Sequence, residues 1–119
     1  MILENHLYHI VAQEDKSFRL KLLSDSVIFK VHFEGLPILP GVCIVRIATE
    51  LVEKIIGKSL QLSEIRSIKF LDIISPDEIL EIDYIFSEIV EKDNTIVAKG
   101  IVSDGNKTFS KFSILFSVV

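Results

Sequence analysis

The sequence predicts an α+β fold in which one strongly curved antiparallel sheet of five to seven strands wraps around a single central helix. The 119 residues include 19 Ile and 11 Val but only 3 Ala, and β-branched residues favour strands over helices. Apolar and polar residues alternate in several separate runs, which is the pattern of strands with one buried face. One segment, residues 41–56, instead has helical spacing and is apolar around most of its circumference, so other elements must enclose it.

The alternating runs predict the strands in chain order. They cover residues 18–22, 27–33, 62–74, 80–86, 96–102 and 112–118. The alternation of the third run slips near Ser67, which predicts a bend or bulge there. Turn-forming residues separate the runs at 24–26, 75–77, 92–94 and 104–106, so we expect antiparallel hairpins.

The helical segment predicts one helix over residues 41–56, which ends at Gly57 in the left-handed conformation that glycine favours. Its polar residues are spaced by three and four, which predicts a narrow polar stripe on one face: Arg46, Glu50, Glu53 and Lys54. A sheet that curves around this helix leaves its edge strands exposed, and pairing between two copies would protect them. We therefore expect a homodimer.

The composition limits the class of protein. A chain of 119 residues that is 49% hydrophobic predicts a single ordered domain over residues 1–119. The net charge of −4 argues against nucleic-acid binding, and no apolar run approaches the roughly 20 residues of a membrane span. The first residues lack the basic and apolar parts of a secretory leader, so we expect a cytoplasmic protein.

The cysteine and histidine content predicts neither a disulfide nor a metal site. Cys43 is the only cysteine, and its apolar neighbours predict a small packed residue. His6, His9 and His32 have no spacing typical of a metal site, and we expect the first two at the surface.

The segment from His32 to Val42, HFEGLPILPGV, has the residues of a candidate active site. Its two prolines and two glycines predict a rigid, irregular loop that leads into the helix. The first backbone N–H groups of that helix, those of Gly41 and its successors, lack partners within the helix and could bind a carbonyl oxygen that becomes negative. His32 is largely neutral at pH 7 and could act as a base beside them.

This segment resembles the signature of the β-hydroxyacyl-(acyl carrier protein) dehydratases of hot-dog fold, which reads approximately His-Phe-Pro-Gly-x-Pro-x-x-Pro-Gly-Val. The departure is Glu34, which stands where that family usually has proline. The matching residues are His32, Phe33, Gly35, Pro37, Pro40, Gly41 and Val42. The resemblance implies a hot-dog fold and a 3-hydroxyacyl-thioester dehydratase of fatty-acid or polyene-type biosynthesis.

The resemblance also implies roles for individual residues. His32 would take a proton from C2 of the substrate, the backbone carbonyl of Ile38 would hold His32, and the amide of Gly41 would bind the thioester carbonyl. Val42, the next residue, is a further candidate for substrate binding. No cofactor or metal is implied. The acyl thioester would be carried by acyl carrier protein or coenzyme A.

One position departs from this pattern. The family's carboxylic acid lies fourteen residues after the histidine, where this chain has Arg46, and arginine is a very poor proton donor. The nearest carboxylate on the same helix face is Glu50, about 6 Å further along the helix axis. The pair could also be an ordinary exposed i,i+4 ion pair.

Three interpretations of this departure follow. Glu50 could be a displaced acid, with Arg46 orienting it or binding a substrate carboxylate or phosphopantetheine group. His32 and the helix amides could bind or isomerise an acyl thioester without efficient dehydration. The chain could also be a non-catalytic subunit that binds acyl chains or carrier protein and pairs with an active hot-dog relative. A thioesterase of the same fold is a further alternative, with Glu50 activating water.

Overall fold

The computed structural model describes residues 2–31 and 37–119, which form one six-stranded antiparallel sheet and two helices. The strands are β1 Tyr8–Glu14, β2 Ser17–Leu22, β3 Leu60–Phe70, β4 Glu81–Lys92, β5 Thr95–Ser103 and β6 Thr108–Val118. The helices are α1, Val27–Val31, and α2, Gly41–Ile56. Neither of these two helices combines the length and the apolar character needed to cross a membrane.

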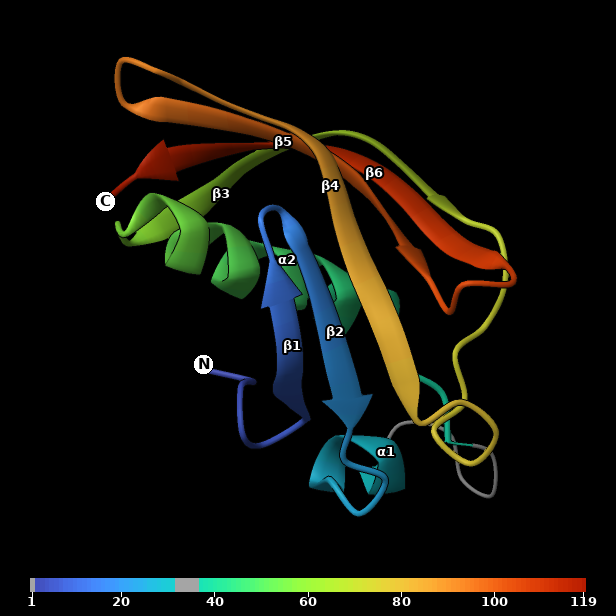
Figure 1. Ribbon diagram of the computed structural model, residues 1–119. Helices are drawn as coiled ribbons and strands as arrows, with labels where there is room; N and C mark the ends of the chain where they lie inside the picture. Colours follow the sequence, from blue (N-terminus) through green and yellow to red (C-terminus); the bar gives the residue numbers. More distant parts are fainter. Residues whose placement is uncertain (1, 32–36) are drawn as a thin grey trace.

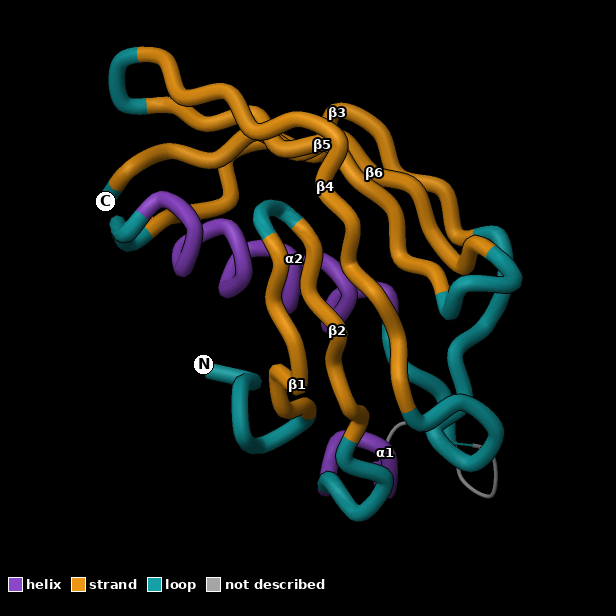
Figure 2. Tube along the Cα trace, in the orientation of Figure 1, coloured by secondary structure: helices purple, strands orange, loops and turns teal. Residues whose placement is uncertain are grey.

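The strands lie in the order β1-β2-β4-β5-β6-β3 and every neighbouring pair is antiparallel. The sheet curves around α2, so that β3 and the β1–β2 hairpin both lie near this helix (Figure 1). Figure 2 shows that α1 and the connection before β4 gather at one end of the sheet. The predicted curved antiparallel sheet with one enclosed helix is confirmed.

The core lies between α2 and the concave face of the sheet. From Cys43 to Val52 every residue of α2 except Arg46 is buried, as expected for a helix enclosed on most sides. The hydroxyl of Tyr84 in β4 donates a 2.8 Å hydrogen bond to the carbonyl oxygen of Ile44, which ties the sheet to the helix backbone. The helix bounds match the prediction, and Gly57 ends the helix with φ 76°, in the left-handed region.

Most predicted strands are confirmed, but β4 continues to Lys92, six residues past its predicted end, and β6 begins at Thr108, four residues before its predicted start. The register of β3 against β6 shifts between Leu62 and Glu64 and again between Ile65 and Ser67, so the predicted irregularity near Ser67 is present. This strand ends at Phe70 rather than continuing to residue 74.

The strand predicted over residues 27–33 is wrong where the structure describes it, because Val27–Val31 is a short helix. Ser26 initiates the helix: its Oγ accepts a hydrogen bond from the N–H of Ile28 and its carbonyl oxygen accepts one from Phe29. Strand β2 already pairs with β1 on one side and with β4 on the other. A strand over residues 27–31 therefore could not form a hairpin with β2, the strand that precedes it. Residues 32 and 33 of the predicted strand lie outside the described residues.

The sequence reasoning missed β1. Only Tyr8 of this strand is buried, and its register against β2 shifts between Ile10 and Ala12, so it lacks a clear alternating pattern. His6 and His9 are exposed, as predicted, although His9 lies within the strand.

Candidate functional site

The start of α2 presents two backbone N–H groups without a partner among the described residues, those of Gly41 and Val42. Pro40 precedes the helix in an extended conformation, with φ −65° and ψ 148°, and its carbonyl oxygen accepts the N–H groups of Cys43 and Ile44. The positive end of the helix dipole lies at the same place. These features suit the stabilisation of a carbonyl oxygen on which negative charge develops.

The segment before α2 is anchored to the rest of the fold. The N–H of Leu39 donates a 2.8 Å hydrogen bond to the carbonyl oxygen of Ile74, and both side chains are buried. The ring of Phe70 packs against Gly41 so closely that a Cβ atom there would lie 2.7 Å from Phe70 Cζ. Glycine at position 41 therefore allows the end of β3 to cover the helix start. Ile38 is half-buried and Val42 is 72% exposed.

His32, the predicted base, lies outside the described residues, as do Phe33, Glu34 and Gly35 of the motif. Pro37 is the first described residue after them, three residues before Pro40. The role of His32 therefore stays a prediction. The described part of the motif before the helix, residues 37–40, leads directly into the first turn of α2, which contains Gly41 and Val42.

Glu50 is buried beneath the N-terminal segment, with 6% of its side chain exposed. Its Oε1 accepts hydrogen bonds from the N–H of Glu4 at 2.9 Å and from the hydroxyl of Tyr8 at 2.8 Å. Its Oε2 accepts hydrogen bonds from the N–H of Leu3 at 2.7 Å and from Nε of Arg46 at 3.1 Å. A carboxylate offers about four lone-pair sites, and all are filled here.

Arg46 and Glu50 therefore form more than an exposed i,i+4 pair, because one partner is buried. The Arg46 side chain is 34% exposed and borders two grooves. One groove, of about 480 Å³, runs between the first half of α2 and β3 and is lined mainly by Val42, Val45, Leu60 and Leu62.

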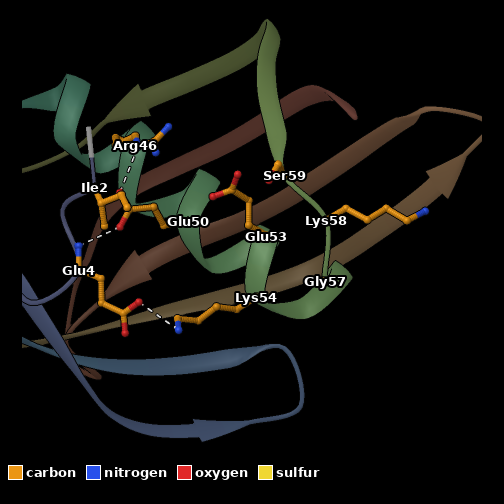
Figure 3. Close-up of a pocket in the computed structure, with 9 residues that line it drawn as sticks. All are labelled: Ile2, Glu4, Arg46, Glu50, Glu53, Lys54, Gly57, Lys58 and Ser59. Carbon is orange, nitrogen blue, oxygen red and sulfur yellow. Dashed lines mark hydrogen bonds and ion pairs between the residues drawn. The ribbon is translucent and has the colours of Figure 1, made fainter. Parts of the chain in front are cut away.

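The second groove, of about 380 Å³, is lined largely by charged residues and follows the outer face of α2 (Figure 3). Charged side chains on its wall are paired: Lys54 contacts Glu4 at 3.0 Å, and Lys58 contacts Glu91 at 2.6 Å. Glu53 accepts the N–H of Leu60 at 2.8 Å. Among the described residues, the Glu53 carboxylate has no cationic partner, and the outer nitrogens of Arg46 are the part of its guanidinium group that Glu50 leaves free.

Sequence reasoning missed the partners of Glu50. Tyr8 lies in a segment that reads as polar and irregular, and the other two donors are backbone N–H groups, which leave no mark in a sequence. The one available signal was Glu50 itself, a carboxylate among the mainly apolar residues 47–52 of the predicted helix. Buried carboxylates are found with partners, so its position indicated that donors must lie nearby.

Cys43 is buried, as predicted, and burial raises the pKa of its thiol. The protonated thiol suits a packed core residue rather than a nucleophile. Within residues 2–31 and 37–119, no three histidine, cysteine or acidic side chains come together in a group that could hold a metal ion.

The comparisons with known proteins agree with this architecture. Among solved structures, the dehydratase heterocomplex ApeI:P from Xenorhabdus doucetiae aligns with a TM-score of 0.62 and 18% identity, over 92% of this chain and 94% of that chain. The thioesterase HI1161 from Haemophilus influenzae aligns with a TM-score of 0.67 and 16% identity, over 97% and 80% of the two chains. The protein smu.793 from Streptococcus mutans, bound to acetyl CoA, aligns with a TM-score of 0.64 and 16% identity, over 100% and 92%.

At these identities the solved structures show a shared hot-dog fold. No match is found among curated proteins. The family comparison is more specific, because the model of the ApeI-like family, described as ApeI dehydratase, matches residues 9–110. This match includes the proline-containing loop, the whole of α2 and the sheet from β2 to β5. The chain belongs to the ApeI-like dehydratase family of hot-dog proteins.

Proposed function

We propose that this protein is a dehydratase that converts a 3-hydroxyacyl thioester into the corresponding enoyl thioester and water. The observation that carries the proposal is the start of α2, where Gly41 and Val42 present N–H groups with no partner among the described residues, directly after the segment that contains His32. Membership of a dehydratase family supports the same reaction class. We place the protein in the cytoplasm, where acyl thioesters are made and used.

In the proposed reaction, His32 takes a proton from C2 of the substrate. The negative charge moves to the thioester oxygen, which the N–H groups of Gly41 and Val42 stabilise, since donors aimed at a developing oxyanion lower the barrier. The C3–O bond then breaks, the C2–C3 double bond forms, and the hydroxyl group takes up a proton and leaves as water. Ile38 is proposed to hold the imidazole through its backbone carbonyl.

One candidate donor of the proton for the leaving hydroxyl is Glu50, the carboxylate on the same helix face as Arg46. All its lone-pair sites already accept hydrogen bonds, so one donor must withdraw before this carboxyl group can carry a proton. The same contacts favour a second candidate function, a subunit that binds acyl thioesters and relies on a related subunit for the acid.

Arg46 is proposed to bind an anionic part of the substrate or its carrier, such as the phosphate of a phosphopantetheine group on acyl carrier protein or coenzyme A. Guanidinium groups suit this task because their N–H groups match the geometry of phosphate oxygens. BH2602 from Bacillus halodurans, another protein of this fold, was solved with CoA.

We also propose that the protein works as a homodimer or with a related hot-dog subunit. Strand β3 lies at the end of the sheet order, and apolar side chains are exposed along it and at the nearby helix start: Val42, Leu62 and Ile65. An exposed edge with apolar side chains favours pairing with another chain. The heterocomplex ApeI:P is an assembly within the same fold.

The test is a dehydration assay with a purified 3-hydroxyacyl-CoA, run in both directions. The substitution His32→Ala should slow turnover by about 10²- to 10⁴-fold, because a general base contributes about that much. The matched control is His9→Ala, which removes an exposed histidine and should leave the rate unchanged.

Two further outcomes separate the alternatives. If the wild-type protein is inactive and Arg46→Glu creates activity, the chain is the silent subunit. If free thiol is released in place of enoyl product, the protein is a thioesterase and the dehydratase proposal is wrong.

A further inference from the structure

The Glu50 carboxylate joins two parts of the chain that are far apart in sequence. Three of its four donors come from the N-terminal segment, which here means residues 2–8: the N–H groups of Leu3 and Glu4 and the hydroxyl of Tyr8. The fourth donor is Nε of Arg46, one turn earlier on α2. A second contact, Lys54 with Glu4 at 3.0 Å, fastens the same segment to the next turn of the helix.

These contacts require an acceptor and not a donor at position 50. An ionised carboxylate only accepts hydrogen bonds, and each of its oxygens here receives two. Burial and the neighbouring Glu50 carboxylate both raise the pKa of Tyr8, so its hydroxyl keeps the proton that it donates. A neutral amide at position 50 would place its NH₂ group against one of these donors, and a buried donor without an acceptor is costly.

The bond to Glu50 also fixes the direction of Arg46. A guanidinium group is planar and rigid, so a hydrogen bond at Nε sets the orientation of the whole group. Figure 3 shows the outer end of the Arg46 side chain extending away from the Glu50 carboxylate. Among the described residues, Nη1 and Nη2 of Arg46 have no hydrogen-bond acceptor, and the Arg46 side chain borders both grooves.

We infer that Glu50 is a positioning residue that fastens the N-terminal segment to α2 and holds Arg46 so that its two outer nitrogens face an anionic ligand group. The anionic group is a phosphate of the carrier arm of the thioester, and this identity rests on the proposed function. Glu50 then acts through Arg46, and the proton for the leaving hydroxyl comes from another group. Glu50 is then not the acid, and the variants described below distinguish a positioning role of Glu50 from a role as proton donor.

The first experiment needs no activity. In NMR spectra of the wild-type protein, the amides of Leu3 and Glu4 should exchange slowly with solvent, and Nε–H of Arg46 should give a resolved, protected signal. The substitution Glu50→Gln should speed exchange at both amides and shift or broaden the Arg46 signal. The matched control is Glu53→Gln on the same helix, where the amide oxygen can still accept the N–H of Leu60. This variant should leave Leu3, Glu4 and Arg46 unchanged.

Unchanged exchange at Leu3 and Glu4 in Glu50→Gln would overturn the inference. If this variant does not fold, Tyr8→Phe replaces it, since it removes one donor and keeps the carboxylate. The Glu4 amide, which shares Oε1 with Tyr8, should then exchange at an altered rate while Nε–H of Arg46 stays protected.

The second experiment compares two thioesters of the same 3-hydroxyacyl group, one on coenzyme A and one on pantetheine, which lacks the phosphates. In Glu50→Gln, KM for the coenzyme A substrate should rise about tenfold, which corresponds to about 1.4 kcal/mol, with little change in kcat. KM for the pantetheine substrate should not change. Arg46→Met should give the same pattern.

If turnover instead falls by about a hundredfold or more with both substrates while KM stays unchanged, Glu50 is the acid and the inference is contradicted. An equal rise in KM for both substrates would also contradict it, because the phosphate would then play no part. If wild-type protein lacks activity, the proposed function fails, and the NMR experiment still decides whether Glu50 positions Arg46.

Discussion

Gly57 illustrates how a single residue ends the central helix. Its φ of 76° lies in the left-handed region, and its N–H donates a 2.8 Å hydrogen bond to the carbonyl oxygen of Glu53. A Cβ atom at this position would contact nothing within 4 Å, so any cost of a side chain comes from the backbone alone. The connection to β3 depends on this conformation.

We therefore predict that Gly57→Ala lowers the free energy of unfolding by about 1 kcal/mol, because the left-handed conformation costs an L-residue about 1–2 kcal/mol. Urea unfolding measures the change. Ser59→Ala, at an exposed site two residues later, is the control and should have little effect. A loss of several kcal/mol would contradict a purely backbone effect.

The prediction of residue roles from sequence was limited by what a sequence can record. The i,i+4 spacing correctly brought Arg46 and Glu50 together. It could not show that Glu50 is buried, because the donors that cover it are mainly backbone N–H groups of the N-terminal segment. Backbone groups are identical in every residue except proline, so only the folded chain reveals this environment.

At the scale of elements, the contact between β4 and β5 depends on Gly100. The register of the two strands shifts between Phe86 and Glu88, opposite this residue. A Cβ atom on Gly100 would lie 2.6 Å from the carbonyl oxygen of Ile85 and 3.1 Å from Cζ of Phe112. The backbone oxygen cannot move without disturbing the sheet, so the close packing at this irregularity requires glycine.

We predict that Gly100→Ala destabilises the protein by about 1–3 kcal/mol, the usual cost of overpacking, through distortion of the β4–β5 pairing. Thermal and urea unfolding would measure the loss, and amide exchange in β4 would locate it. Lys99→Ala, at the neighbouring exposed position, provides the comparison. Equal stability of the two variants would contradict the prediction, because β4 and β5 would then accommodate the added methyl group at little cost.

The elements that were predicted correctly are those whose pattern of apolar and polar residues fits only one type of secondary structure. Residues 41–56 are long, helically spaced and followed by glycine, and they form α2 as predicted. Residues 27–31 are too short for periodicity to decide, since five residues that are apolar except for Lys30 fit a strand or a turn of helix equally. The choice was made by Ser26 at the start of the helix and by the lack of a free neighbour beside β2.

At the scale of the whole molecule, three buried groups hold their protons more strongly in the folded state. Burial raises the pKa of Cys43 above its ordinary value of 9.0, and it raises the pKa of both Tyr8 and Tyr84 above 10.0. The unfolded chain releases these protons at lower pH than the folded chain does. Above about pH 9 the unfolded state therefore binds fewer protons, and stability must fall as pH rises.

We predict that the free energy of unfolding decreases from about pH 8 to about pH 10.5, with the steeper part above about pH 10, where both tyrosines ionise in the unfolded chain. Urea unfolding at several pH values would show the trend. Tyr84→Phe should make the slope shallower, although it also lowers stability at neutral pH by removing the bond to Ile44. A stability that does not change with pH over this range would refute the linkage.

The outer edge of β3 leads to a prediction about assembly. Leu62 and Ile65 are each 43% exposed on this strand, which pairs with β6 on one side only. We predict a dimer in solution, measured by size-exclusion chromatography with light scattering. Ile65→Lys should shift the population toward monomer, whereas Val90→Lys, at a similarly exposed site on β4, should not. A monomeric wild-type protein would contradict this prediction.

The strand order also has a consequence for the way the chain reaches its native state. Strand β3 pairs only with β6, which follows β4 and β5 in the chain, so β3 stays without its sheet partner until these three later strands have been synthesised. Because closing so long a loop is slow, the final step of folding should be the addition of β3 to a sheet already built from the later strands. Truncation after residue 107 would remove β6 and leave β3 without the strand with which it pairs.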